Sequence, residues 1–344
     1  MRQLSFIAPG TVRWEEVAEP RLETPEAALV RPLVVTTCDL DHAIVQGHAP
    51  LAGPFPLGHE FVAEVVDTGQ GVTSFRPGQR VVVPFQVSCG RCDRCTSGLT
   101  GSCRTARPGA AYGMKPIGGD WGGALADLVR VPFADAMLVE LADGISPTAV
   151  ASASDNLPDA WRTVAPHLAD RPGADVLVVG GWARSIALYA VAIARALGAG
   201  RVDYVDADRE RLERAEKLGA RPLEGPPPRR AGSFPITVDA SGDPAGLACA
   251  LRSVEPNGVC TSVAIYFAET PLPLLEMYTR GVHFITARVN ARPHIPEVLE
   301  LVGAGRLHPE VVNSAIVPWD DADEAIVADL LKPVFVRPEL YASV

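Results

Sequence analysis

The sequence predicts a two-domain α/β protein, and three observations support this. The chain has 344 residues, which exceeds the usual size of a single hydrophobic core. About the first 150 residues read mainly as short β segments broken by Gly and Pro. The region that follows alternates strand-like and helix-like patterns, which is typical of a parallel sheet with right-handed crossovers.

The composition excludes some classes of partner. Apolar residues make up 47% and charged residues 21%, an ordinary globular balance, and the net charge is -10. We expect no nucleic-acid partner, because phosphate binding needs a basic surface. The N-terminus has no small-residue cleavage site and no apolar run reaches about 18 residues, so we expect a soluble, cytoplasmic protein without a membrane partner.

Each part has its own expected elements. Apolar runs between Gly and Pro predict strands in the first part at 28–37, 61–69, 80–86 and 125–131. Helical spacing begins at 154–168. Strands are then expected at 175–181, 201–208, 236–241 and 258–266, with helices at 185–199, 208–220 and 244–254. The Pro-rich segment 221–235 is expected to be a surface loop, and 295–307 and 311–330 to be a helical return and an edge segment.

Four of the seven cysteines lie within fifteen residues. They follow the pattern C-x2-C-x2-C-x7-C at Cys89, Cys92, Cys95 and Cys103. Such a density is typical of metal binding rather than of disulfides. Four thiolates suit a closed, tetrahedral zinc site, and an iron–sulfur cluster is the alternative. The single tight loop with Gly and polar residues between the cysteines favours structural zinc.

A second motif gives the sequence a resemblance to a known family. The pattern G-H-E-x2-G-x5-G-x2-V is met at every fixed position except Ala63, which replaces a glycine. The matching residues are Gly58, His59, Glu60, Gly69 and Val72. With the cysteine loop and the βαβ unit, the chain resembles the zinc-dependent medium-chain dehydrogenase/reductase (alcohol dehydrogenase) family over nearly its whole length.

The resemblance implies a fold and its boundaries. Members have a GroES-like β domain that is interrupted by a Rossmann domain and completed by the C-terminal segment. In this chain, residues 1–156 and 289–344 would form the GroES-like catalytic domain, with the structural zinc loop at 89–103. Residues 157–288 would form the dinucleotide-binding Rossmann domain.

The resemblance also implies a catalytic zinc, so that two zinc ions are expected per chain. Cys38 and His59 match the first two ligand positions, and Asp155 is the candidate for the third, as in formaldehyde-dehydrogenase-like relatives with a similar S-D-x-L-P stretch. The alternative for Asp155 is that it caps the helix begun near Pro158. Cys⁻ and Asp⁻ with neutral His balance the charge of Zn²⁺ and leave a fourth position open. Glu60 is expected to support the ligands or to act as a base beside them.

The proton relay of the family is altered. Relatives place Ser or Thr two residues after the ligand Cys and His five residues after it, whereas this chain has Leu40 and Ala43 there. His42 is the candidate substitute, since its ordinary pKa lies near neutrality. A surface histidine without a role in proton transfer is the alternative. Asp41 is expected to orient the ligand loop.

The turn after the strand at 175–181 departs from the dinucleotide fingerprint G-x-G-x-x-G. Gly180 and Gly181 can form the bend, but Trp182 stands where the second glycine is expected. The third position falls on Ser185, or on Ala187 if the turn has two extra residues. The indole could block the pyrophosphate, point outward, or cover the bound cofactor.

Charged residues near the turn support a dinucleotide. Arg184 is a candidate for contact with the pyrophosphate, with a solvated surface charge as the alternative. Asp206 ends the next expected strand, where an acidic side chain accepts hydrogen bonds from the adenosine ribose. We therefore expect NAD rather than NADP, although Arg209 could tolerate a 2′-phosphate.

Together these features predict an oxidoreductase. It would interconvert an alcohol and its aldehyde or ketone by zinc-assisted hydride transfer with NAD(H). The alternative is a non-redox zinc enzyme, or a binding protein of the same fold, whose dinucleotide binding is impaired by Trp182 and whose relay is lost at Leu40. A small-molecule alcohol or carbonyl compound is the expected partner, in a homo-oligomer (dimer or tetramer).

Overall fold

A computed structural model describes residues 1–341, and this part of the chain divides into two compact units. Of these residues, the first unit comprises 1–158, 289–303 and 313–341, and the second comprises Asp159–Arg288 and Ala304–Val312. The segment 304–312 therefore belongs to the second unit, whereas the sequence predicted all of 289–344 in the first domain. The reason is local packing, because Arg214 donates to the Val311 carbonyl at 2.7 Å and Arg306 donates to the Ala196 carbonyl at 2.8 Å.

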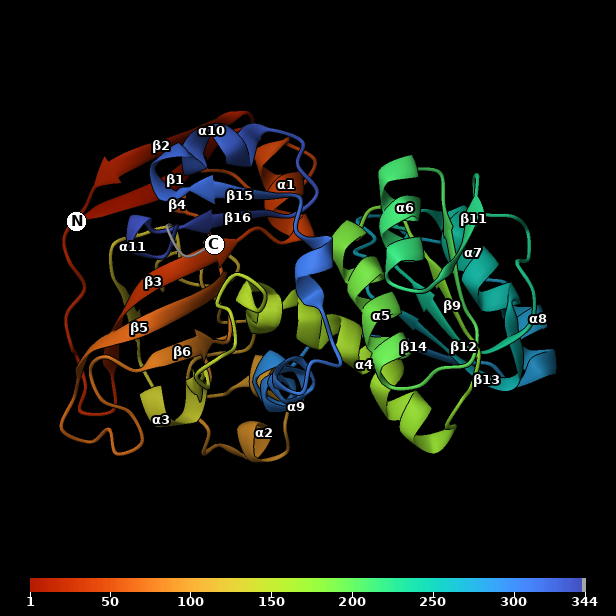
Figure 1. Cartoon of the computed structure of the whole chain (residues 1–344), viewed down its shortest axis with the longest axis horizontal. Helices are drawn as coiled ribbons and strands as arrows, with labels where there is room; N and C mark the ends of the chain where they lie inside the picture. Colours follow the sequence, from red (N-terminus) through yellow and green to blue (C-terminus); the bar gives the residue numbers. More distant parts are fainter. Residues whose placement is uncertain (342–344) are drawn as a thin grey trace. The chain divides into compact units, whose positions relative to one another are not determined.

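The first unit is built on two sheets. One has the strand order β2-β1-β4, and the other has the order β15-β16-β3-β5-β6-β8 with β7 paired to β3 (Figure 1). The strands are β1 (Arg2–Ala8), β2 (Thr11–Glu16), β3 (Ala28–Thr36), β4 (Phe55–Pro56), β5 (Glu60–Thr68), β6 (Arg80–Val83), β7 (Val129–Val131), β8 (Val139–Glu140), β15 (Ala315–Pro318) and β16 (Pro333–Val336). The four strands expected in the first part of the chain thus form as β3, β5, β6 and β7.

Short helices complete the first unit. They are α1 (Asp39–Val45), α2 (Asp93–Thr96), η1 (Thr100–Ser102), α3 (Ala134–Met137), η2 (Ala151–Ser154), α9 (Ala291–Gly303), η4 (Trp319–Asp321), α10 (Ala322–Val327) and α11 (Pro338–Tyr341). Helix α4 (Asn156–Asp170) follows η2.

The register of the larger sheet brings distant segments together. β3 runs antiparallel to β5 with Thr36 opposite Glu60, and β16 runs antiparallel to β3 with Val334 opposite Thr36. The residues just after β3, just before β5 and just before β16 therefore meet at one edge of this sheet. The apolar side chains of β3, β5 and β16 are buried. This burial fixes the register, because a slip of one residue would expose them.

The second unit has a six-stranded sheet in the order β11-β10-β9-β12-β13-β14, and all of its strand pairs are parallel. The strands are β9 (Val176–Val179), β10 (Val202–Asp206), β11 (Arg221–Glu224), β12 (Phe234–Asp239), β13 (Val254–Ser262) and β14 (His283–Thr286). The helices are α5 (Arg184–Ala196), α6 (Arg209–Lys217), α7 (Pro244–Arg252), α8 (Leu274–Arg280) and η3 (Pro309–Val312). This strand order is that of a doubly wound nucleotide-binding sheet.

One expectation for this unit is wrong. The Pro-rich segment 221–235 is not wholly a loop, because its first four residues form β11 and its last two begin β12. β11 pairs with β10, and Arg221 forms a two-pronged ion pair with the buried carboxylate of Asp203. That pairing stabilises a strand whose own residues have little β propensity.

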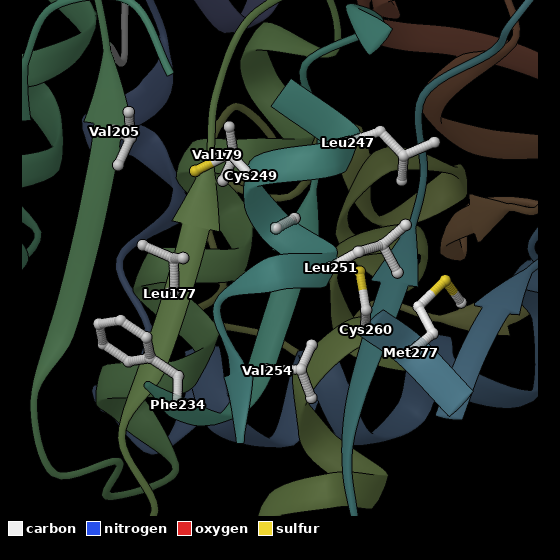
Figure 2. Packing of buried hydrophobic residues seen from close by; sticks show 11 residues of the cluster. Leu177, Val179, Val205, Phe234, Leu247, Cys249, Leu251, Val254, Cys260 and Met277 are labelled. Carbon is white, nitrogen blue, oxygen red and sulfur yellow. The ribbon is translucent and has the colours of Figure 1, made fainter. Parts of the chain in front are cut away.

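The core of the second unit lies where α7 covers the sheet. Figure 2 shows Leu247 and Leu251 of this helix with Leu177 and Val179 of β9 in one apolar cluster. Cys249 and Cys260 belong to the same cluster and are fully buried, so they serve as apolar core residues. Among residues 1–341, no helix is long and apolar enough to cross a membrane.

Candidate metal and dinucleotide sites

Three predicted ligands come together in the first unit. The thiol of Cys38, a ring nitrogen of His59 and a carboxylate oxygen of Asp155 all lie within 4.8 Å of one another, and all three residues are buried. Cys38 follows β3, His59 precedes β5, and Asp155 lies directly before α4. The antiparallel pairing of β3 and β5 accounts for the first two, and the η2 turn brings in the third.

Local hydrogen bonds hold Cys38 in place. It is the N-cap of α1, where its Sγ accepts from the backbone N–H of Leu40 at 3.1 Å. The carboxylate of Asp41 accepts from the backbone N–H of Cys38 at 3.0 Å. Asp41 therefore orients the ligand loop at the start of α1.

His59 lies between two carboxylates. Its Nδ1 is 3.4 Å from Asp41 Oδ1, and its Nε2 is 3.4 Å from Asp155 Oδ2. The ring is completely buried, and neither nitrogen has a hydrogen-bond partner in the described structure. Buried polar atoms are almost always satisfied, and Asp41 already faces Nδ1, so the unsatisfied Nε2 beside Asp155 indicates that a further group belongs here.

A zinc ion would change the protonation states of Cys38 and His59. Burial raises the pKa of the Cys38 thiol to about 12. Burial alone lowers the pKa of His59, but Asp41 and Cys38 outweigh it and raise that pKa well above its ordinary value. Zn²⁺ requires the opposite states, a thiolate and a neutral imidazole, and its charge supplies the energy for both. Three ligands of these types suit a zinc ion with one open position.

The four-cysteine loop forms a second cluster of the first unit. The sulfur atoms of Cys89, Cys92, Cys95 and Cys103 lie within 4.8 Å of one another. Cys103 is fully buried, and its Sγ accepts from two backbone N–H groups at 3.4 Å. Backbone N–H groups, that of Arg104 foremost, lower the pKa of Cys92 to about 6, which favours a thiolate. Four sulfur ligands without an open position fit a structural zinc ion.

Glu60 does not face the ligands as a free base. Its Oε2 accepts from the ammonium group of Lys332 at 2.7 Å and from the Ser152 hydroxyl at 2.9 Å, and its Oε1 accepts from the Asn156 N–H at 3.1 Å. Burial raises the pKa of Glu60 to about 8, and Lys332 opposes this shift. The sequence reasoning missed Lys332. The residues around it, "LLKPVFV", do not show that its charge is buried.

The relay candidate contacts an exposed carboxylate. His42 Nε2 is 3.3 Å from the carboxylate of Asp329, which is largely exposed. Leu40 packs against a buried cluster that includes Phe85 and Met114. Leu40 therefore serves as an apolar packing residue, and His42 has contact with solvent through Asp329.

In the second unit, the turn after β9 is attached to the segment after β12. The backbone N–H of Trp182 donates to the Ser241 carbonyl, and that of Ala183 donates to the Ala240 carbonyl, both at 2.9 Å. The indole packs edge-to-face on Phe267 with the ring centroids 6.4 Å apart. A Cβ on Gly181 would overlap the carbonyl of Ser241, which explains the glycine at this close approach.

The first turn of α5 is compatible with both alignments. The helix begins at Arg184, so Ala187 is its fourth residue, where a small side chain allows close packing on the sheet. Ala187 and Ser185 are both fully buried, whereas Arg184 is partly exposed. The position of the third glycine is therefore taken by a small, buried side chain in either alignment.

Asp206 ends β10, as expected, but its oxygens are already engaged. Arg211 donates to both carboxylate oxygens at 2.8 Å, the Tyr204 hydroxyl donates at 2.8 Å, and the Asp208 N–H donates at 3.0 Å. These four bonds fill the usual acceptor positions of a carboxylate. Arg209, by contrast, is exposed and pairs with Glu213 at 3.2 Å. The strand order and the place of Asp206 fit a dinucleotide, whereas the turn and the carboxylate are occupied by groups of the chain itself.

Comparison with known proteins agrees with both units. Residues 24–143 match the family model of the alcohol dehydrogenase GroES-like domain, and residues 185–304 match that of the zinc-binding dehydrogenases. An alcohol dehydrogenase from Thermus sp. ATN1 is 33% identical, and the match covers 98% of this chain and 100% of that one with a TM-score of 0.88. The chain belongs to the zinc-dependent alcohol dehydrogenase family.

Two curated members of this alcohol dehydrogenase family give similar matches. A probable zinc-binding alcohol dehydrogenase of Mycobacterium tuberculosis is 29% identical over 94% of this chain and 83% of its own length. A glutathione-independent formaldehyde dehydrogenase of Pseudomonas aeruginosa is 34% identical over 63% of this chain and 57% of its own length. The prediction of a GroES-like domain with a Rossmann domain is confirmed, and so is that of an oxidoreductase of the alcohol dehydrogenase family.

Proposed function

We propose that this protein interconverts an alcohol and its aldehyde or ketone at a zinc ion held by Cys38, His59 and Asp155, with NAD(H) as the hydride partner. The convergence of these three buried side chains, with two unsatisfied ring nitrogens on His59, is the observation that carries the proposal. A zinc ion bound there polarises the substrate oxygen and lowers the pKa of an alcohol.

The residues of the chain have separate tasks around this site. Asp41 holds the backbone of Cys38 and faces Nδ1 of His59, so that Nε2 is directed towards Asp155. A carboxylate behind a ligating histidine fixes the ring orientation and raises its basicity. His42 is the proposed exit for the proton. It lies in the last turn of α1, and its ring contacts the exposed Asp329.

The cysteine loop is proposed to bind a second, structural zinc ion. Cys89, Cys92, Cys95 and Cys103 leave no position for substrate, so this ion would stabilise the loop rather than take part in the reaction. Zinc content of the purified protein tests both sites. We expect two zinc ions per chain, of which Cys38→Ala removes one. A single zinc that survives Cys38→Ala would contradict the catalytic site.

For the dinucleotide, the strand order of the second unit and the place of Asp206 support binding across the end of the sheet. The bound dinucleotide accepts or supplies the hydride. Binding must displace Trp182 from Phe267 and release the N–H groups of the turn. NAD stays the prediction over NADP, although Arg211 offsets the negative charge of Asp206.

A second candidate function rests on the same turn. If the bonds of Trp182 and Ala183 to the segment after β12 persist, the chain would be a zinc enzyme without hydride transfer, or a binding protein. A titration of NADH and NADPH against tryptophan fluorescence separates the candidates. The first predicts saturable NADH binding that is tighter than NADPH binding, together with aldehyde-dependent consumption of NADH. No binding of either nucleotide would favour the second.

Trp182→Gly gives the matched comparison. It removes an aromatic pair worth about 0.5–1.5 kcal/mol, so we expect NADH to bind about 3- to 10-fold more tightly. Phe267→Ala should act in the same direction, and Trp161→Phe, which changes a tryptophan outside this turn, should have no effect. Weaker NADH binding by Trp182→Gly would mean that the indole covers the cofactor instead of competing with it.

A homo-oligomer is also part of the proposal. Helix α8 exposes Leu274, Leu275 and Tyr278, whose exposed fractions are 64%, 76% and 84%. The neighbouring β14 is an end strand of its sheet within the described residues, and a strand edge can pair with its own copy about a two-fold axis. Leu275→Glu with Tyr278→Glu should reduce the mass measured by light scattering. An unchanged mass would exclude this surface as the oligomer interface.

A cytoplasmic location stays a prediction.

A further inference from the structure

A buried ion pair links the three segments that carry the proposed zinc ligands. Lys332 is completely buried, directly before β16. Its ammonium group donates to the Thr37 carbonyl at 2.5 Å and to Glu60 Oε2 at 2.7 Å. Thr37 precedes Cys38, and Glu60 follows His59. One cation from the C-terminal segment thus touches the neighbours of two ligands.

Glu60 extends this link to the third ligand. Its Oε1 accepts from the Asn156 N–H at 3.1 Å, and its Oε2 also accepts from the Ser152 hydroxyl at 2.9 Å. Asn156 follows Asp155 directly, and Ser152 lies three residues before it. The carboxylate therefore receives three donors, each from a different residue, and none of these is itself a proposed ligand.

The pairing of β16 with β3 does not require the ion pair of Lys332 and Glu60 to hold the two strands together. β16 is already joined to β3 by its backbone register, and the Thr36 hydroxyl donates to the Pro333 carbonyl at 2.7 Å. Moving two charges out of water costs several kcal/mol per ion, and apolar residues of similar volume are often at least as stable. A buried pair at this place is therefore better explained by positioning than by stability.

We propose that Lys332 is a positioning residue for the zinc site, which together with Glu60 joins the segments that carry Cys38, His59 and Asp155. The proposal rests on the proposed zinc site. Its physical basis is preorganisation, because a ligand set that is fixed before binding loses less conformational freedom when the ion enters. Residues behind metal ligands typically contribute about 10- to 100-fold in metal affinity.

The test is zinc affinity, measured by competition with a chelator. In Lys332→Met, which keeps the length of the side chain without its charge, we expect the affinity of the Cys38 site to fall about 10- to 100-fold. The four-cysteine site is the internal control and should keep its affinity, since a general loss of folding would weaken both. Lys332→Arg should recover part of the loss. Thr36→Val, which removes a buried hydrogen bond of the same strands, should leave both affinities unchanged.

Cobalt substitution gives a readout that is independent of activity. Release of Glu60 should alter the ligand-field spectrum of Co²⁺ at the Cys38 site in Lys332→Met and not in Thr36→Val. If Lys332→Met does not fold, Lys332→Met with Glu60→Gln removes the uncompensated charge and should show the same loss of affinity. Unchanged affinity and spectrum, or equal losses at both metal sites, would overturn the role of Lys332. A wild-type protein that binds no zinc through Cys38 would instead refute the proposed function.

Discussion

The imidazole of His59 faces the carboxylate of Asp41 through Nδ1 and that of Asp155 through Nε2, with 3.4 Å between the closest atoms on each side. The two acids have different surroundings. Asp41 also accepts from the backbone of Cys38, whereas Asp155 belongs to the cluster of possible metal ligands. One histidine thus lies between a carboxylate that holds the Cys38 backbone and a carboxylate proposed as a ligand, and substitutions of the two acids should have different effects.

For Asp41→Asn, we expect zinc affinity at the Cys38 site to fall about 10- to 100-fold. The amide keeps an acceptor for the Cys38 N–H but loses the charge that faces His59 Nδ1. Chelator competition measures the change. The zinc of the four-cysteine loop should not respond, and equal affinity in wild type and variant would show that Asp41 only caps α1.

Asp155→Ala should remove one zinc ion and lower kcat/KM by at least about 100-fold, since three ligands become two. Asp155→Cys should retain the metal, because a thiolate supplies the same charge and is a common zinc ligand. Zinc analysis of both variants is the measurement. If Asp155 acts only as a helix cap, both variants would keep two zinc ions.

Cys103→Ser should remove the other zinc ion and destabilise the first unit. Its thiol is fully buried and accepts two backbone N–H groups, so the substitution removes both a candidate ligand and the sulfur atom that these groups contact. Bound structural zinc contributes directly to folding free energy. We expect a lower Tm with the zinc of the Cys38 site retained. A normal Tm with both ions present would argue against a structural metal in this loop.

The ion pair of Asp206 and Arg211 should stabilise the folded protein at neutral pH and lose this contribution in acid. Burial raises the pKa of Asp206, but the Arg211 guanidinium and the Asp208 N–H outweigh it and hold that pKa below its ordinary value. A carboxylate whose pKa is depressed in the folded state stabilises the protein above its unfolded pKa, about 3.9, and loses this contribution as pH falls through its folded pKa. Asp206→Asn should therefore lower the Tm at neutral pH.

The acid range gives the control for this prediction. Below pH of about 4, the difference in Tm between wild type and Asp206→Asn should shrink as the wild-type carboxylate is protonated. Thermal melts at several pH values measure it. A difference that stays constant from neutral to acid pH would mean that the loss comes from packing rather than from the charge of Asp206.

His42→Gln tests the proposed proton exit. The amide keeps the size of the side chain but cannot take up a proton near neutrality, so kcat for alcohol oxidation should fall about 10-fold or more and its pH profile should change shape. Zinc content should stay at the wild-type level, because His42 is not one of the three candidate ligands. An unchanged pH profile would assign proton release to solvent alone.

Much of this protein could be read from local patterns. The spacing of Cys89 to Cys103, the GHE motif and the alternation of strands and helices are encoded by neighbouring residues, and they predicted the family and the two-domain fold. The strands at 28–37 and 61–69 carry buried apolar residues whose period specifies their pairing. That pairing brings Cys38 and His59 together.

Other features depended on contacts between segments that are far apart in the sequence. Lys332 lies 272 residues from Glu60, and nothing in "LLKPVFV" indicates that its charge is buried. The bond of Trp182 to Ser241 and the pairing of Arg211 with Asp206 likewise depend on which strand ends lie side by side. Sequence by itself determined which residue types can bind metal and the approximate places of strands such as β3, β5, β9 and β10. Only the tertiary structure decided which polar groups are already satisfied, because desolvation and hydrogen bonding arise when distant segments exclude water from one another.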